Sequence, residues 1–138
     1  MHLTKLTTPE DSATVNLAVD THSGFALLTL SGPITTATMG LAFRSLLRHR
    51  DYSRRMPAVW DFTNASSSMD PVALHQIATF LSAREDRHHT KIAIVVVGNL
   101  QRSLSRIYDA IAASDVPQTR QLFTNVYAAI GWVLPIAA

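Results

Sequence analysis

Three serines and two aspartates lie close together in the stretch VWDFTNASSSMDP, which runs from Val59 to Pro71. A serine nucleophile needs a base within hydrogen-bond reach. The nearest histidine along the chain is His75, on the following predicted helix, and the sequence has no Gly-x-Ser-x-Gly elbow. The residues therefore predict a turn first, in which Asp61 ends a strand and small polar side chains satisfy the backbone. A hydrolase that uses the loop over residues 61–70 is an alternative of lower weight.

Metal, thiol and cofactor chemistry find little support in the sequence. The chain has no cysteine, and the adjacent histidines of Arg87–His89 cannot easily point together from a helix. Gly98, in VVVGN, offers one backbone N–H near a helix start, but no phosphate-binding glycine pattern surrounds it. We therefore expect no catalytic residue, no metal and no cofactor.

Arginines are concentrated in one short segment, RSLLRHRDYSRR. This pattern can indicate an anion-binding patch for phosphate, a lipid headgroup or nucleic acid, or simply the solvated end of a helix, where cations suit the negative dipole. Of the two interpretations we favour the helix end. Tyr52 is the one aromatic residue among them, so stacking platforms for bases are missing and we expect no nucleic-acid binding. The five arginines are Arg44, Arg48, Arg50, Arg54 and Arg55.

Apolar periodicity predicts the elements that position these residues. Alternation over residues 13–19 and the run from Phe25 indicate an antiparallel hairpin, and residues 91–97 read as an inner strand covered on both faces. Thr35 or Thr36, Asp70 with Pro71, and Asn99 are expected to start helices. The remaining expected elements are helices over 33–50, 70–83, 99–114 and 125–134, and strands over 56–62 and 119–125.

The order of a hairpin followed by alternating helices and strands predicts an α/β fold with a mixed, mostly parallel sheet and about four helices. A chain of 138 residues with 47% apolar and 16% charged residues fits one domain over 1–138, with its core at about 13–134. The N-terminus does not read as a signal peptide, and no apolar run approaches the ~20 residues of a membrane-spanning helix. We expect a cytoplasmic protein without membrane insertion.

The ordered motifs LSGPIT, VWDFT, KIAIVVVG and QLFTNVYAAIGWVL resemble the SpoIIAA-like family, which is related to the STAS (anti-sigma factor antagonist) fold. The resemblance covers roughly residues 13–134 and implies a mixed sheet with the hairpin toward one edge. It also implies a serine at the start of the helix after VWDFT that takes a phosphate in the switched members. Here that helix begins SMDPVA, so aspartate and proline stand where the switch needs aspartate, serine and a small residue.

The resemblance implies a non-enzymatic regulatory or protein-interaction module of STAS-like type. The alternative is a carrier or sensor of a small apolar or lipid-like ligand, as in the lipid-binding relatives of the fold. The partner would then be a protein or a small apolar ligand, and we further expect a homodimer, because closed two-fold pairing is the most common oligomer.

Ligands of open parallel sheets bind outside the carboxyl ends of the strands, where helix N-termini also point. In the predicted fold this edge collects small hydrogen-bonding side chains, which we take as candidate ligand- or partner-binding residues. Thr124 and Asn125 follow the last strand at the same edge. The candidates are Asp61, Thr63, Asn64, Ser66, Ser67, Ser68, Gly98 and Asn99.

Overall fold

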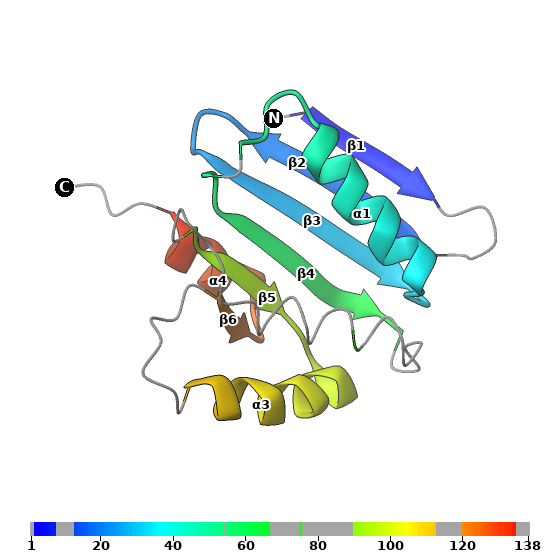
Figure 1. Ribbon diagram of the computed structural model, residues 1–138, viewed down its shortest axis with the longest axis vertical. Coiled ribbons are helices and arrows are strands. Elements are labelled where there is room, and N and C mark those ends of the chain that lie inside the picture. The colour runs from blue at the N-terminus through cyan, green and yellow to red at the C-terminus, as the bar shows by residue number, and fades with distance from the viewer. Residues whose placement is uncertain are drawn as a thin grey trace.

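The protein was analysed as a computed structural model, which describes residues 2–7, 13–53, 55–66, 75, 90–112 and 120–134. These residues form one six-stranded sheet and three helices (Figure 1). The elements in chain order are β1 (His2–Thr7), β2 (Thr14–Asp20), β3 (Phe25–Gly32), α1 (Thr36–Arg48), β4 (Ala58–Ala65), β5 (Ile92–Val95), α3 (Gly98–Ala112), β6 (Arg120–Phe123) and α4 (Val126–Val133).

The sheet is mixed, and its strands follow the order β1-β2-β3-β4-β5-β6. The first three strands are antiparallel neighbours, whereas β3, β4, β5 and β6 run parallel to one another. The parallel connections carry α1 and α3, because a chain that returns to start a parallel strand needs a crossover. The predicted α/β class and mixed, mostly parallel sheet are confirmed.

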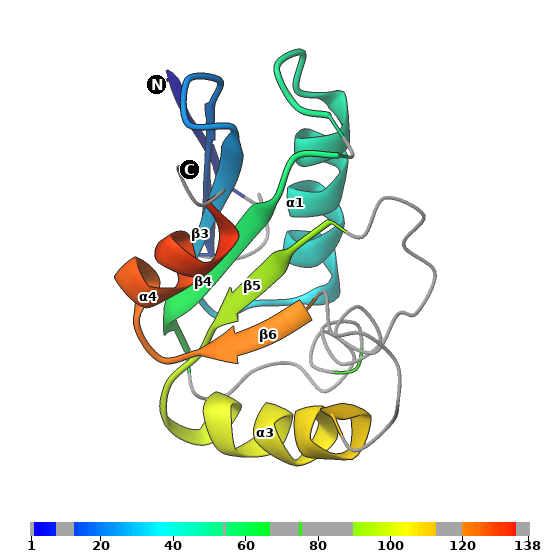
Figure 2. The same cartoon turned by 90° about the vertical axis from the view of Figure 1, so that its left-hand side faces the viewer.

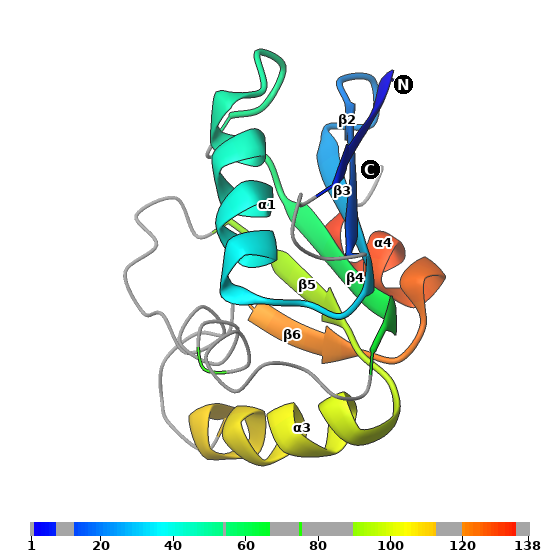
Figure 3. The same cartoon turned by 90° about the vertical axis from the view of Figure 1, so that its right-hand side faces the viewer.

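Helices cover both faces of the sheet. Figure 2 and Figure 3 show α1 on one face and α4 on the other. Strand residues alternate between the two sides, so Leu28 and Trp60 pack on the α1 side, while Val59 and Val95 pack on the α4 side. Leu100 and Leu104 of α3 belong to the cluster on the α1 side. The protein therefore has two apolar cores separated by the sheet.

The start of α1 is fixed by a reciprocal capping box. The N–H of Thr38 donates to the Thr35 hydroxyl at 3.3 Å, and the N–H of Thr35 donates to the Thr38 hydroxyl at 3.2 Å. This confirms Thr35 as a cap. Farther along the helix, the ring of Phe43 lies 4.7 Å from that of Trp60 between centroids, which ties α1 to β4. Trp60 is 1% exposed and is therefore part of the core.

Two details of the predicted architecture need correction. The strand β1 was not predicted, and it pairs with β2 from His2↔Val19 to Thr7↔Thr14, which makes β1 the edge strand. The predicted antiparallel hairpin of β2 and β3 lies toward that edge, as expected. The described residues also contain three helices instead of about four. The helix expected over 70–83, with its start at Asp70 and Pro71, lies outside the described residues except for His75.

Candidate functional site

The carboxyl ends of β4, β5 and β6 lie at one edge of the sheet, because these strands are parallel neighbours. The last Cα pairs are Asp61↔Val95 between β4 and β5, and Val95↔Phe123 between β5 and β6. The segments that follow these pairs therefore lie side by side at this edge of the sheet. We call them together the carboxyl edge, which comprises residues 61–66, 97–99 and 124–127.

Within the carboxyl edge, Asp61 holds a β-bulge in place. Between the pairs Thr29↔Asp61 and Ser31↔Asn64 the register of β3 and β4 shifts, so β4 contains one extra residue. Such an insertion disrupts the ladder of hydrogen bonds locally. The Asp61 carboxylate accepts from the N–H of Thr63 at 2.9 Å and from its hydroxyl at 2.5 Å. Asp61 is 9% exposed, so its carboxylate has a structural task and faces the solvent little.

The bulge corrects the prediction that the strand ends at Asp61. Pairing with β3 resumes beyond the extra residue, at Ser31↔Asn64 and Gly32↔Ala65, so β4 continues to Ala65. Thr63 and Asn64 are exposed there. Ser66 follows the strand, and its N–H donates to the Gly32 carbonyl at 2.8 Å. The candidate residues Ser67 and Ser68 lie outside the described residues.

Gly98 and Asn99 lie at the start of α3, and both are exposed. Gly98 has φ +63°, a conformation that costs a side-chain-bearing residue energy, and a Cβ there would meet nothing within 4 Å. The helix begins at Gly98, so the prediction of Asn99 as the cap is wrong. The Asn99 side chain instead accepts a hydrogen bond from the Arg102 guanidinium, one turn along the helix.

Asn125 caps the last helix. Its side-chain oxygen accepts from the N–H groups of Tyr127 and Ala128, at 2.8 and 3.2 Å. A hollow of about 390 Å³ lies beside this cap, between α3 and the end of β6. Its lining combines uncharged hydrogen-bonding side chains with an apolar part from Leu122, Phe123 and Ala128. The polar lining residues are Gln101, Ser105, Gln121, Thr124 and Asn125.

Two apolar side chains at the carboxyl edge were missed as candidates. Val97 is 39% exposed and Tyr127 is 80% exposed, which makes them two of the three large apolar side chains exposed among the described residues. Val97 belongs to the run KIAIVVV, which we expected to be buried throughout, but β5 ends at Val95. Tyr127 lies in the first turn of α4. It stands within the mostly apolar run NVYAAIGWVL, whose pattern does not indicate that the tyrosine is exposed. The exposure of these two side chains is therefore visible only in the three-dimensional structure.

Groups of three or more side chains able to hold a metal ion are absent from the described part of the chain. Within the same residues, none of the helices is long and apolar enough to cross a membrane.

No protein-family model matches the chain, and no curated protein matches it. Among solved structures, it is similar to an uncharacterised protein of the DUF3478 family with a SpoIIAA-like fold from Shewanella loihica PV-4. The two share 15% sequence identity with a TM-score of 0.54, and the match covers 93% of this chain and 98% of the other. The chain has a SpoIIAA-like fold. At this identity the likeness concerns the fold, because one fold can serve many functions.

The SpoIIAA-like fold places the carboxyl edge described above, but its residues have to be judged by their own geometry. Of the eight candidates, Asp61, Thr63, Asn64, Ser66, Gly98 and Asn99 are described, and all six lie within or just after the carboxyl ends of the parallel neighbours β4 and β5. Asp61 and Asn99 are engaged in local hydrogen bonds. The exposed side chains of Asn64, Val97 and Tyr127 are available to a partner, whereas the Thr63 hydroxyl donates to Asp61.

Proposed function

We propose that this protein is a non-enzymatic, regulatory protein-interaction module that binds another protein at its carboxyl edge. The observation that carries the proposal is the exposure of Val97 and Tyr127 beside a row of small polar residues. Interfaces between proteins commonly have an apolar or aromatic centre and a polar rim. Tyrosine is among the residues that contribute most to binding when a partner covers them.

The local chemistry of Asp61 supports a module without catalysis. A catalytic carboxylate has to reach a substrate, whereas this one is nearly buried and accepts two hydrogen bonds from Thr63. The hydrolase alternative depends on the loop over 61–70, of which residues 67–70 lie outside the described part. Nothing in the geometry of residues 61–66 favours it.

A carrier of a small apolar ligand is the second candidate function. Such a carrier needs a cavity lined mainly by apolar side chains. The hollow beside Asn125 mixes amides and hydroxyls with apolar side chains, and the hollow at the end of α1 is lined by Arg48, His49, Arg50 and Asp51. Both linings carry several polar side chains, which supports the interaction module over the apolar carrier.

A capture experiment with matched variants tests the proposal. The wild-type protein, the double variant Val97→Ser/Tyr127→Ser and the control Leu47→Ser would be immobilised, and proteins retained from a lysate of the source organism quantified by mass spectrometry. Leu47 is 54% exposed but lies in the last turn of α1, at the opposite end of the fold. We expect a partner that wild type and Leu47→Ser retain equally and that the double variant loses. Equal retention by all three proteins would contradict the proposal.

We also propose that the protein forms a homodimer. The chain is short and rich in apolar residues, and closed two-fold pairing is the most common oligomer. Light scattering at high micromolar concentration measures this directly. A mass of one chain, 15.1 kDa, at that concentration would end the idea.

A further inference from the structure

The positive charge of this protein is concentrated at one end of the fold. The segment 44–55 contains five arginines and one aspartate, a formal charge of +4, whereas the whole chain carries +2. The rest of the chain therefore carries −2. An uneven distribution of this kind attracts a negatively charged surface even when the net charge is small.

The last two turns of α1 combine these charges with an exposed apolar side chain. Arg44, Leu47 and Arg48 are three and four residues apart, so they lie on the same face of the helix. All three are exposed, and Leu47 is 54% exposed. The opposite face of the helix is buried through Ala42 and Leu46. An exposed leucine flanked by arginines combines the apolar and cationic contacts that favour adsorption at an anionic lipid–water interface.

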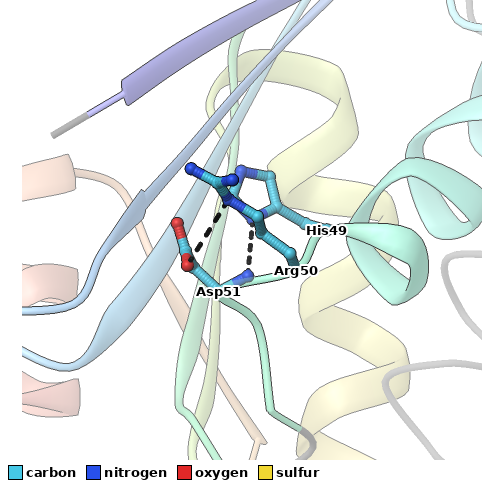
Figure 4. Close-up of polar contacts among 3 residues, drawn as sticks. All are labelled: His49, Arg50 and Asp51. Carbon is cyan, nitrogen blue, oxygen red and sulfur yellow. Dashed lines mark hydrogen bonds and ion pairs between the residues drawn. The ribbon is translucent and has the colours of Figure 1, made fainter.

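The loop after α1 extends the same surface. Arg48, His49, Arg50 and Asp51 line a hollow of about 630 Å³, and the Arg50 side chain is 93% exposed. The N–H of Asp51 donates to Nδ1 of His49 at 3.2 Å (Figure 4). Because Nδ1 is the acceptor, the neutral ring carries its proton on Nε2 and offers a donor there. Asp51 Oδ1 lies 4.0 Å from Arg50 Nε, and it is the one negative charge of the segment.

We propose that the surface formed by Arg44, Leu47, Arg48, His49 and Arg50 adsorbs to membranes that contain anionic phospholipids. Guanidinium groups and the His49 N–H match the phosphate groups of such lipids, and Leu47 inserts among the headgroups. Isolated phosphate is a poorer fit, because an arginine as exposed as Arg50 is well hydrated and gains most from many phosphates at once. Nucleic acid is a poorer fit because Tyr52, half-buried, is the one aromatic residue of the segment.

The position of this surface leaves the carboxyl edge free. The helix α1 starts at Thr35 beside the carboxyl end of β3 and runs to the opposite end, where the loop leads to Ala58 at the start of β4 (Figure 1). Adsorption therefore does not depend on the proposed protein partner. It requires no membrane-spanning segment.

Co-sedimentation with lipid vesicles tests the proposal. The protein would be mixed with vesicles of phosphatidylcholine alone and of phosphatidylcholine with phosphatidylglycerol, at low and high ionic strength. We expect partitioning only into the anionic vesicles, and weaker partitioning at high salt. Arg50→Gln should lower the partition coefficient roughly five-fold, because each basic residue near such a surface contributes about that much. Arg102→Gln, an equal loss of charge from an exposed position on α3, should leave it unchanged.

Two further variants separate the charged from the apolar contribution to adsorption. Asp51→Asn should raise partitioning a few-fold, because it removes the one carboxylate of the segment 44–55, 4.0 Å from Arg50. Leu47→Ser should lower partitioning at high salt as well as at low salt, since its contribution is apolar. Equal sedimentation with neutral vesicles, or equal losses for Arg50→Gln and Arg102→Gln, would overturn the proposal. So would tighter, Arg50-dependent binding to duplex DNA, or release from the vesicles by inorganic phosphate but not by chloride of the same ionic strength.

Discussion

The carboxylate of Asp61 accepts two hydrogen bonds from Thr63, two residues farther along β4, and so closes the bulge at the end of this strand. This relationship explains why a stretch rich in aspartate and serine does not have to be a catalytic loop. The carboxylate accepts a hydrogen bond from a backbone N–H at the point where the extra residue interrupts the ladder. As a result, β4 continues to Ala65 and presents Thr63 and Asn64 to the solvent.

Asp61→Ala should destabilise the protein by about 1–2 kcal/mol, because the N–H of Thr63 loses its acceptor in a nearly buried place. Asp61→Asn keeps a side-chain oxygen for that N–H and should cost less than half as much. Urea unfolding of both variants measures the difference. Equal losses for alanine and asparagine would mean that the charge, and not the acceptor, is what the bulge requires.

Gly98→Ala should destabilise the protein by about 1–2 kcal/mol through its positive φ alone, because a Cβ there meets nothing within 4 Å. Gly131→Ala is the matched control. Gly131 is also free of contacts within 4 Å, but it lies inside α4 without a positive φ. Its replacement should stabilise the protein by about 0.5–1 kcal/mol. The two thermal unfolding midpoints should move in opposite directions, and a shared direction would show that the φ of Gly98 is not what matters.

Trp132→Ala should cost about 2–3 kcal/mol, less than a fully buried tryptophan, because Trp132 is half-buried. Its ring lies 5.5 Å from that of Phe123 between centroids. Lys91 Nζ lies 5.0 Å from the ring centroid and donates to the Trp132 carbonyl at 3.0 Å. Urea unfolding measures the loss. A cost below that of an ordinary surface substitution would mean that α4 is held by Ala129 and Val133 without this ring.

The sequence allowed much of the fold to be predicted, because the decisive signals are local. Alternation predicted β2 and β3, an uninterrupted apolar run predicted β5 with Ala93, Ile94 and Val95 fully buried, and a threonine before an apolar period predicted the cap of α1. By contrast, β1 has the sequence HLTKLT, whose leucines are three residues apart and do not alternate. Its pairing with β2, which local pattern cannot show, makes it a strand.

The candidate site could be predicted only in part. Parallel strand order was enough to bring Thr63, Asn64 and Gly98 to one edge. The bulge after Asp61 depends on register with β3, and a shift of one residue is invisible in a single strand. The tryptophans illustrate the same limit, since Trp60 is fully buried and Trp132 is half-buried. The sequence around each gives no sign of this difference, which depends on how the helices pack on the sheet.

Asp20 should make stability depend on pH on the acid side. The backbone N–H of Ser23, with a further N–H from His22, holds the pKa of this exposed carboxyl below its ordinary value. A lowered folded-state pKa contributes stability above the unfolded-state pKa, and this stability is lost as the pH falls through the folded-state value. Asp20→Asn should therefore reduce the fall in the urea midpoint over that acid range. An identical fall in wild type and variant would show that the turn gains nothing from the charge.

The central claim is that another protein binds the carboxyl edge, and site-specific photo-crosslinking tests it most directly. A photoreactive phenylalanine analogue would replace Tyr127, 80% exposed at that edge, and in a parallel sample Leu47, 54% exposed at the other end of the fold. After irradiation of living cells, the account predicts a discrete higher-mass protein adduct from position 127 and none from position 47. Mass spectrometry of the adduct should identify a different protein. No adduct from position 127, the same adduct from both positions, or an adduct made only of two copies of this chain would contradict the claim.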